Sequence, residues 1–485
     1  MDLNERIGHA ARWSAATEIA AKLAAPLTNG ILARLLMPEV FGVVAALTLV
    51  TGFAEIITAA GAQKYLVQHS FSGEAELDSC TNGVFWTHFP LSLLLWGLIA
   101  GFAEPIAGIV GAPGYGSAVA VMGAQIPLLT LSGIQSARFR RDFGFRSLFG
   151  VRIAVSLVPL AVTVPAALLL KNHWALVIGT LARDALNAVL LTVKSPWRPG
   201  LGMEFSRWKQ MLPHMLWYLV ESMTVWLTAN VGLLILSSCL QPYYLGLYKT
   251  AITTANGYLG IITAAATPVL FSGLSRYQGD PNRFRDLYFR FQRNTALVVF
   301  PLAVGVFVFR DLATWILLGS RWQETADFLG LWFLMSGLTM VFHNYNSEAF
   351  RSMGKPVLSI LVQLIYMAVL IPALLWTAAQ SYRVMTTVRA LMLLWIIAVS
   401  SGVLQCAAGI RFWESVKNVW PPLISAALMG ITAWLLERFG PGDWWQLLSA
   451  GFCAGVYVGL LWLIPAGRQQ FTAFFVWRKA KEQKP

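Results

Sequence analysis

Hydrogen-bonding and ionisable side chains recur at helical spacing inside long apolar runs of this chain. One such stripe, in the run from about 243 to 274, consists of Lys249, Thr253, Asn256, Gly260, Thr263 and Thr267. On a helix of about 3.6 residues per turn these positions lie within about 40° of one line. No acidic residue shares that face, so a protonated ammonium at Lys249 needs water or an anionic ligand. The stripe therefore offers a cation to an anion, and amide and hydroxyl groups to a ligand that carries hydroxyls.

A second stripe lies in the run from about 10 to 36, where Glu18, Lys22 and Asn29 share one helix face. Two interpretations of its charged pair stay open. Glu18 and Lys22 are four residues apart and can neutralise each other, or Lys22 can bind an anion beside Asn29. Pro26 has no N–H to donate to the carbonyl of Lys22, which predicts a bend in the helix next to this cation.

Acidic residues occur in similar apolar settings. Glu55 and Glu221 each share a helix face with hydroxyl-bearing residues, in the runs near 41–66 and 211–237. An acid in surroundings of low dielectric constant can titrate near neutral pH. Together with Glu18, these two residues are therefore candidates for binding a proton or a sodium ion.

Arg183 and Arg389 also lie inside apolar runs. Arg183 is followed by Asp184, and we interpret this neighbouring pair as a structural ion pair. Arg389 is a candidate binding residue, although a structural role fits the sequence equally well. The four cysteines lack metal-binding spacing, and the sequence contains no nucleophile elbow or phosphate-binding loop. We therefore predict no metal, no cofactor and no enzymatic activity.

The elements that position these residues follow from the composition. Of the 485 residues, 57% are hydrophobic and 12% are charged, and the mean hydropathy is +0.61. Soluble chains carry about 25% charged residues, so soluble enzymes and disordered proteins are excluded. Apolar runs of about 20 residues, the length of a transmembrane helix, fill nearly the whole chain. They predict an all-α polytopic membrane protein with about 14 transmembrane helices, near 10–36, 41–66, 81–103, 112–136, 148–170, 174–194, 211–237, 243–274, 294–318, 325–350, 357–379, 384–410, 419–437 and 444–466.

The basic residues predict the orientation of these helices. With a cytoplasmic N-terminus, 24 of the 36 Lys and Arg residues fall on the inner side and 5 on the outer side. Positive residues concentrate in cytoplasmic segments, so both termini are predicted to be cytoplasmic. The same rule explains the net charge of +13 without a nucleic-acid partner.

Three short motifs occur twice in the same order. L-x-P-x-x-[FL]-G lies at 36–42 and 240–246, IITAA at 56–60 and 261–265, and S-x-x-F-R at 136–140 and 347–351. The offsets of 204, 205 and 211 residues indicate two parallel copies of a six-helix unit, a transporter layout. The predicted domains are an N-lobe at 1–194, a cytoplasmic linker at 195–210, a C-lobe at 211–410, two further helices at 411–467 and a basic cytoplasmic tail at 468–485.

Three longer stretches resemble a known family. The runs 31–68, 243–280 and 317–356 are similar to conserved stretches of the bacterial polysaccharide transporter family. These proteins are the Wzx-type flippases of lipid-linked oligosaccharides, within the multidrug/oligosaccharidyl-lipid/polysaccharide exporter superfamily. The matching features include the S-R-x-Q sequence at 275–278, the Gly-x-x-Trp turn at 319–322 and the Gly-Lys pair at 354–355.

The resemblance implies two six-helix lobes around a lumen lined by helices 1, 2, 7 and 8. It also implies alternating access that moves an undecaprenyl-pyrophosphate-linked oligosaccharide across the inner membrane, for exopolysaccharide, capsule or O-antigen. Lys22 and Lys249 would then bind the pyrophosphate, while Asn29, Thr253 and Asn256 would hydrogen-bond sugar hydroxyls.

Other hypotheses remain at this stage. A multidrug extruder of the same superfamily would rely on acidic lumen residues, and a membrane-embedded polysaccharide polymerase would need a large external loop. A scaffold would need no lined cavity. The partners expected for a flippase are its lipid-linked substrate, membrane lipids, a polysaccharide polymerase, a chain-length and export complex, and H⁺ or Na⁺ as the driving ion.

Overall fold

The computed structural model describes residues 24–69, 71, 73–141, 144–200, 205–377, 380–440 and 442–472. Every regular element in these ranges is helical. Eleven helices among the described residues are long and apolar enough to cross a membrane. The predicted all-α polytopic membrane architecture is therefore confirmed, while the count of about 14 spans stays a prediction.

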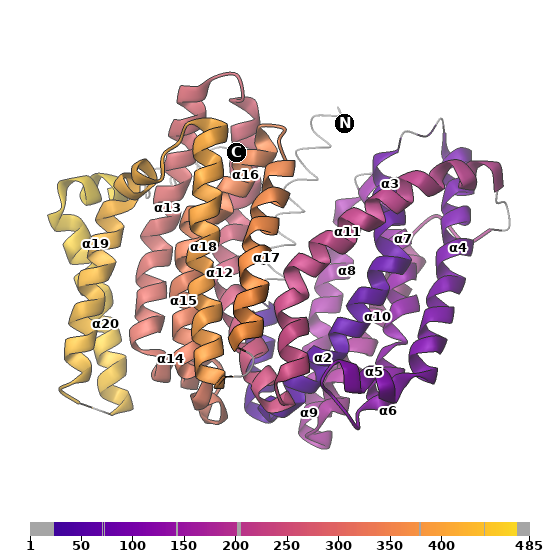
Figure 1. Ribbon diagram of the computed structural model, residues 1–485, viewed down its shortest axis with the longest axis horizontal. Helices are drawn as coiled ribbons and strands as arrows, with labels where there is room; N and C mark the ends of the chain where they lie inside the picture. Colours follow the sequence, from indigo (N-terminus) through magenta and orange to yellow (C-terminus); the bar gives the residue numbers. More distant parts are fainter. Residues whose placement is uncertain are drawn as a thin grey trace. The chain divides into compact units, whose positions relative to one another are not determined.

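The chain divides into two compact units, residues 1–249 and 250–485. In unit 1, residues 24–35 are helical. They are followed by α2 (Pro38–Glu55), η1 (Ile56–Ala60), α3 (Gly61–Gln68), α4 (Glu74–Gly101), α5 (Ala103–Ile109), α6 (Gly116–Met122), α7 (Gln125–Arg141), α8 (Phe145–Val158), η2 (Pro159–Thr163), α9 (Val164–Leu170), α10 (His173–Lys194) and α11 (Phe205–Cys239). Helix α11 packs against α2, η1 and α3 of the same unit (Figure 1).

The division between the two units falls within α12 (Pro242–Arg276). Unit 2 then continues with α13 (Pro281–Val308), α14 (Arg310–Leu317), η3 (Ser320–Thr325), α15 (Ala326–Thr339), η4 (Met340–Asn344), α16 (Tyr345–Ser352), α17 (Val357–Thr377), α18 (Tyr382–Ala408), α19 (Phe412–Glu437) and α20 (Asp443–Leu463). Helices α19 and α20 are neighbours, and α19 packs along α13 (Figure 1). The predicted boundaries of the lobes and of the linker between them stay predictions.

Among the described residues, three short π-helical turns interrupt the long helices. They are η1 after α2, η2 after α8 and η4 after α15. A π-turn inserts an extra residue, which rotates the following side chains around the helix axis, and such turns are frequent at functional sites. The two IITAA copies differ here, since residues 56–60 form η1 whereas 261–265 lie in continuous α-helix.

The two copies of the L-x-P-x-x-[FL]-G motif touch each other inside unit 1. Pro38 begins α2 and Pro242 begins α12, positions where the missing N–H of proline costs no hydrogen bond. A Cβ added to Gly42 would lie 1.7 Å from the carbonyl oxygen of Pro242, and one added to Gly246 would lie 1.8 Å from that of Pro38. Only glycine fits at these two positions, because any larger residue would overlap a backbone carbonyl.

A buried polar network holds the C-terminal helices to unit 2. The Tyr288 hydroxyl of α13 donates to Asn346 Oδ1 on α16 at 2.6 Å, and Asn346 Nδ2 donates to Ser400 Oγ on α18 at 3.1 Å. Asn346 thus takes part in interhelical hydrogen bonding, the usual role of polar residues between membrane helices. On α19, Asn418 Nδ2 donates to the Phe289 carbonyl at 2.8 Å.

Helix α20 donates a hydrogen bond to a backbone carbonyl that a proline leaves without its usual donor. Pro301 lies inside α13 and has no N–H for the carbonyl of Leu297, four residues earlier. The hydroxyl of Tyr457 on α20 donates to that carbonyl at 2.9 Å in the buried interior. In a membrane, unpaired backbone groups are satisfied by neighbouring helices in this way.

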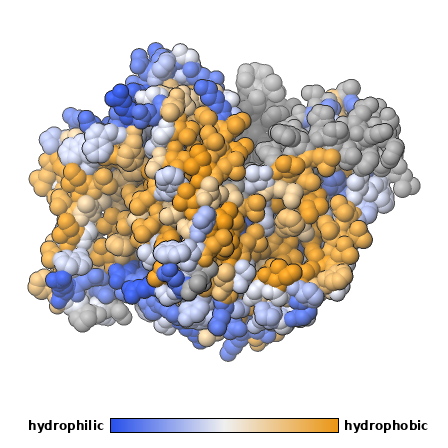
Figure 2. Space-filling model, in the orientation of Figure 1, coloured by the Kyte–Doolittle hydropathy of each residue, from blue (hydrophilic) through white to orange (hydrophobic). Residues whose placement is uncertain are grey.

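The outer surfaces of the helices are apolar. Figure 2 shows hydrophobic residues over the sides of the helices on the visible face and hydrophilic residues gathered near the helix ends. The side chains of Leu169 and Leu463 are 84% and 79% exposed. This distribution fits helices whose sides face lipid.

Candidate functional site

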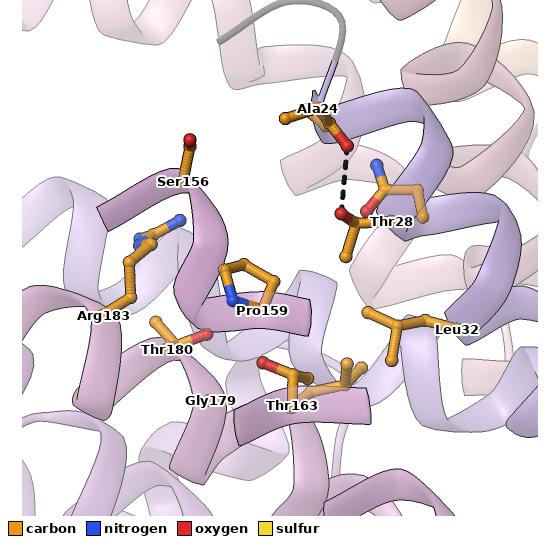
Figure 3. A pocket seen from close by; sticks show the side chains of 12 residues that line it. Ala24, Thr28, Leu32, Ser156, Pro159, Thr163, Gly179, Thr180 and Arg183 are labelled. Atoms are coloured by element: carbon orange, nitrogen blue, oxygen red, sulfur yellow. Dashed lines mark hydrogen bonds between the residues drawn. The ribbon is translucent and has the colours of Figure 1, made fainter. Parts of the chain in front are cut away.

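A polar pocket of about 390 Å³ lies in unit 1 between residues 24–32, the α8–η2 segment and α10 (Figure 3). The residues that line it combine hydroxyls, an amide and one guanidinium with small apolar side chains. They include Thr28, Asn29, Ser156, Pro159, Thr163, Thr180 and Arg183. Asn29, a residue of the predicted second stripe, therefore lies in one pocket with Arg183.

The local sequence explains how η2 and α10 come together to line this pocket. Pro159 begins the π-turn η2, whose last residue, Thr163, lines the pocket. On α10, Gly179 allows this turn to approach closely, because a Cβ there would lie 1.9 Å from Thr163 Oγ1. The hydroxyl of Thr28 donates its hydrogen to the Ala24 carbonyl at 2.9 Å (Figure 3). The Thr28 oxygen can therefore only accept a hydrogen bond from a ligand.

The charged group of this pocket is part of a three-residue cluster. Arg183 Nε donates to Asp184 Oδ1 at 3.0 Å, and the side chains are 43% and 5% exposed. Glu55, at the end of α2, is half-buried and interacts electrostatically with both residues. The predicted Arg183–Asp184 ion pair is confirmed, and it has a third member that we did not expect from the sequence.

A second polar pocket, of about 300 Å³, lies within unit 2. Helices α12, α15, η4 and α18 supply its lining, which consists of Asn256, Leu259, Gly260, Thr263, Trp332, Ser336, Thr339, Met340, Asn344 and Leu393. Asn256, Gly260 and Thr263 are members of the predicted stripe on α12. The helical spacing thus identified correctly the face of α12 that borders a cavity.

Trp332 is held in this pocket on two sides. Its indole N–H donates to Asn256 Oδ1 at 3.3 Å, and the guanidinium of Arg389 lies 4.8 Å from the centre of its ring. Arg389 in turn donates to the Tyr366 hydroxyl at 2.8 Å. A guanidinium over an indole is a favourable cation–π contact, so α15, α17 and α18 are joined at this point.

The remaining predicted site residues have separate locations. Glu18 and Lys22 lie outside the described residues, and so does the side chain of Glu221 on α11. Thr253 is exposed on α12, and Lys249 is partly buried on the same helix, about two turns before Asn256. Their proposed roles in binding stay predictions.

Several lining residues were missed in the sequence. Trp332, Ser336 and Thr339 follow each other at helical spacing on α15, but single hydroxyls in an apolar helix usually bond to the backbone of their own helix. Arg183 was assigned to a structural pair only. Its position three and four residues after Thr180 and Gly179, on the same side of α10, could have indicated that Arg183 lines a pocket.

A fold of membrane-spanning helices in which each unit encloses a polar pocket defines a multi-pass membrane transporter. The fold is similar to the lipid II flippase MurJ in an inward closed conformation, with a TM-score of 0.73 and 12% identity over 92% of this chain and 98% of that one. It is also similar to an inward-facing multidrug resistance MATE family transporter, with a TM-score of 0.63 and 12% identity over 84% and 99% of the two chains.

The chain belongs to the polysaccharide biosynthesis protein family, whose pattern matches residues 31–327. Its relatives include the succinoglycan biosynthesis transport protein ExoT of Rhizobium meliloti (strain 1021), 24% identical over 90% of this chain and 89% of that protein. The lipopolysaccharide biosynthesis protein WzxC of Escherichia coli (strain K12) is 19% identical over 75% and 71% of the two chains. These matches confirm the family resemblance noted in the sequence.

Proposed function

We propose that this multi-pass membrane protein translocates lipid-linked oligosaccharide units across the bacterial inner membrane during polysaccharide biosynthesis. The observation that carries the proposal is the pocket of unit 1, in which Arg183 and Asn29 face a polar cavity between helices that otherwise present apolar surfaces. A cation inside a membrane-spanning helix is costly and usually has a function there. The relatives named for transport in succinoglycan biosynthesis and for lipopolysaccharide biosynthesis support the substrate class.

The pyrophosphate of the substrate would bind to the cations of the predicted lumen. Arg183 uses Nε for Asp184, and the described residues offer no further hydrogen bond to its two Nη groups. A guanidinium fork of this kind suits a phosphate, because it can donate two parallel hydrogen bonds. Lys22 and Lys249 are the further cations that we propose, with Asn29, Thr253 and Asn256 as donors and acceptors for sugar hydroxyls.

The driving ion would bind to the acidic residues of unit 1. Glu55 and Asp184 place two carboxylates against the single guanidinium of Arg183, which gives the ionised cluster a net negative charge. Binding of H⁺ or Na⁺ would neutralise that charge and favour anion binding by Arg183, and release of the ion would restore the negative charge and weaken anion binding. Glu18 and Glu221 are further candidates for this coupling, and the protein would alternate between inward and outward access.

The proposed orientation places both termini in the cytoplasm, and the proposed partners are a polysaccharide polymerase and its export complex. Reporter tags at residue 75, in the 276–293 loop and at the C-terminus should report a cytoplasmic location, and tags at 172 and 440 an external one. An external 276–293 loop would contradict this topology.

The function is tested in a deletion strain and in proteoliposomes. Without the protein, cells should accumulate lipid-linked oligosaccharide on the cytoplasmic leaflet, and purified wild-type protein should move the same extracted lipid across a vesicle membrane. Normal export in the deletion strain, together with no movement in vesicles, would contradict the proposal. A deletion that only sensitises cells to toxic cations would favour a multidrug extruder instead.

A further inference from the structure

The pocket of unit 2 presents a defined set of hydrogen-bonding groups. Thr263 donates its hydroxyl hydrogen to the Gly260 carbonyl at 3.1 Å, and Thr339 donates to the Met335 carbonyl at 2.8 Å. Each hydroxyl therefore offers acceptor lone pairs to the cavity. Asn256 accepts from the indole of Trp332 through Oδ1, which leaves its Nδ2 as a donor.

The π-turn η4 adds a second amide to this set. Asn344 ends η4 and lines the pocket, whereas Asn346, two residues later, is directed into the buried network with Tyr288 and Ser400. Residues two positions apart are separated by about 200° around a helix axis, so the side chains of Asn344 and Asn346 lie on opposite sides of the helix. Within the described residues, neither the Asn344 amide nor the Ser336 hydroxyl has a hydrogen-bond partner.

Charge and size restrict what this pocket can hold. The ten described residues of its lining carry no formal charge, in contrast to the pocket of unit 1, which contains Arg183. A phosphate or an ammonium group would lose its hydration here without a countercharge. The volume of about 300 Å³ is at the lower end of the range for small-molecule sites, which fits a single sugar residue better than a whole oligosaccharide.

The apolar part of the lining completes the match to a sugar. Leu259, Met340, Leu393 and the indole of Trp332 lie beside the amides and hydroxyls. A pyranose ring has the same combination, with C–H groups on its faces and hydroxyls around its rim. Because Arg389 covers the indole at 4.8 Å and is itself held by Tyr366, the position of Trp332 is fixed before any ligand arrives.

We propose that this pocket binds one uncharged sugar residue of the translocated oligosaccharide and thereby selects which glycans are transported. The inference rests on the proposed flippase function and assigns the recognition of neutral sugars to Asn256, Ser336, Thr339 and Asn344. Arg389 acts as a positioning residue, since it contacts Trp332 rather than the cavity.

Occupancy of the pocket can be measured by protection of an introduced thiol. In a chain whose four cysteines are replaced by Ala, Ser336→Cys is labelled with a maleimide in nanodiscs, and Thr432→Cys at a half-buried position of α19, outside the pocket, is the control. The probe is the repeat-unit oligosaccharide released from its lipid by mild acid. It should slow labelling at 336 and leave the control site unchanged, whereas inorganic pyrophosphate should protect neither.

A matched pair of variants tests the hydrogen bonds. Thr339 and Thr432 both donate to the carbonyl four residues earlier, at 2.8 and 2.9 Å, but only Thr339 lines the pocket. Thr339→Val should slow translocation of the extracted lipid-linked oligosaccharide about five-fold, the effect of losing one net hydrogen bond, and should reduce the protection at 336. Thr432→Val should match wild type in both assays.

The outcomes separate this proposal from the function on which it rests. If the wild type translocates the lipid-linked oligosaccharide but the free oligosaccharide gives no protection at 336, the sugar site is wrong and the flippase function stands. Protection by pyrophosphate, or a Ser336→Cys thiol that no maleimide reaches, would also overturn the sugar site. If the wild type translocates nothing, the proposed function itself fails.

Discussion

Replacing Arg183 by Met tests whether this residue serves the fold, the ligand or both. The substitution leaves the carboxylate of Asp184 buried without its partner and close to Glu55. At 3.0 Å and an effective dielectric constant of about 20, the lost attraction is about 5 kcal/mol. Because the Arg183 side chain is 43% exposed and screened by solvent, we expect about half of this, 2 to 3 kcal/mol.

The double variant Arg183→Met/Asp184→Leu separates stability from transport. Removing both charges leaves no unpaired carboxylate from this pair, and apolar replacement of a buried ion pair is often neutral in stability. We expect the single variant to lose about 5 °C of thermal stability in detergent, measured by size-exclusion chromatography of heated samples, and the double variant to recover most of it. Both variants should lose transport, because both lack the guanidinium.

Two results would refute this reasoning. Wild-type thermal stability of Arg183→Met would show that the ion pair contributes nothing to the fold. Wild-type translocation by the double variant in proteoliposomes would show that Arg183 does not bind the substrate. Asp184→Leu alone is the matched control, since it keeps the cation and should retain the larger part of anion binding.

Substitutions at four further residues have defined outcomes. At normal membrane abundance, Lys249→Arg should keep substantial glycan export, Lys249→Ala should lose most of it and Lys249→Glu should lose all of it. The reason is that the charge at this position matters more than detailed geometry. Export by Lys249→Glu equal to wild type would exclude Lys249 as a substrate-binding cation. Tyr457→Phe should destabilise the protein by about 1 kcal/mol in thermal unfolding, because the Leu297 carbonyl loses its donor, and unchanged stability would mean that another group replaces it. Gly42→Ala and Gly246→Ala should each lower the yield of folded protein, since the new Cβ would overlap a carbonyl; wild-type yield from both would contradict the close approach.

The helical architecture and one wall of a pocket could be predicted from the sequence. Apolar runs of membrane-spanning length fix where helices form, and their polar interruptions are short. On α12, the spacing of Asn256, Gly260 and Thr263 identified the face that borders the pocket of unit 2. This worked because α12 is continuous, so a constant angle per residue describes the whole helix.

The opposite wall could not be predicted, because a π-turn has no clear sequence signal. One inserted residue changes the helical phase by about 100°, and η4 does this between Thr339 and Asn344. The IITAA copies illustrate the difficulty, since the same five residues form η1 in one place and α-helix in the other. Tertiary contacts decide between the two, and η1 packs against α11 and α7.

The contact between Gly42 and Gly246 has the form of an interface between two copies of one chain. Each glycine meets the carbonyl of the proline that opens the other's helix, so the contact is the same when seen from either side. Such isologous contacts arise in homodimers around a two-fold axis. In a homodimer, one glycine codon would supply both sides of such a contact. Here Gly42 and Gly246 have separate codons that mutate independently, so each glycine is constrained by a carbonyl encoded in the other copy of the motif.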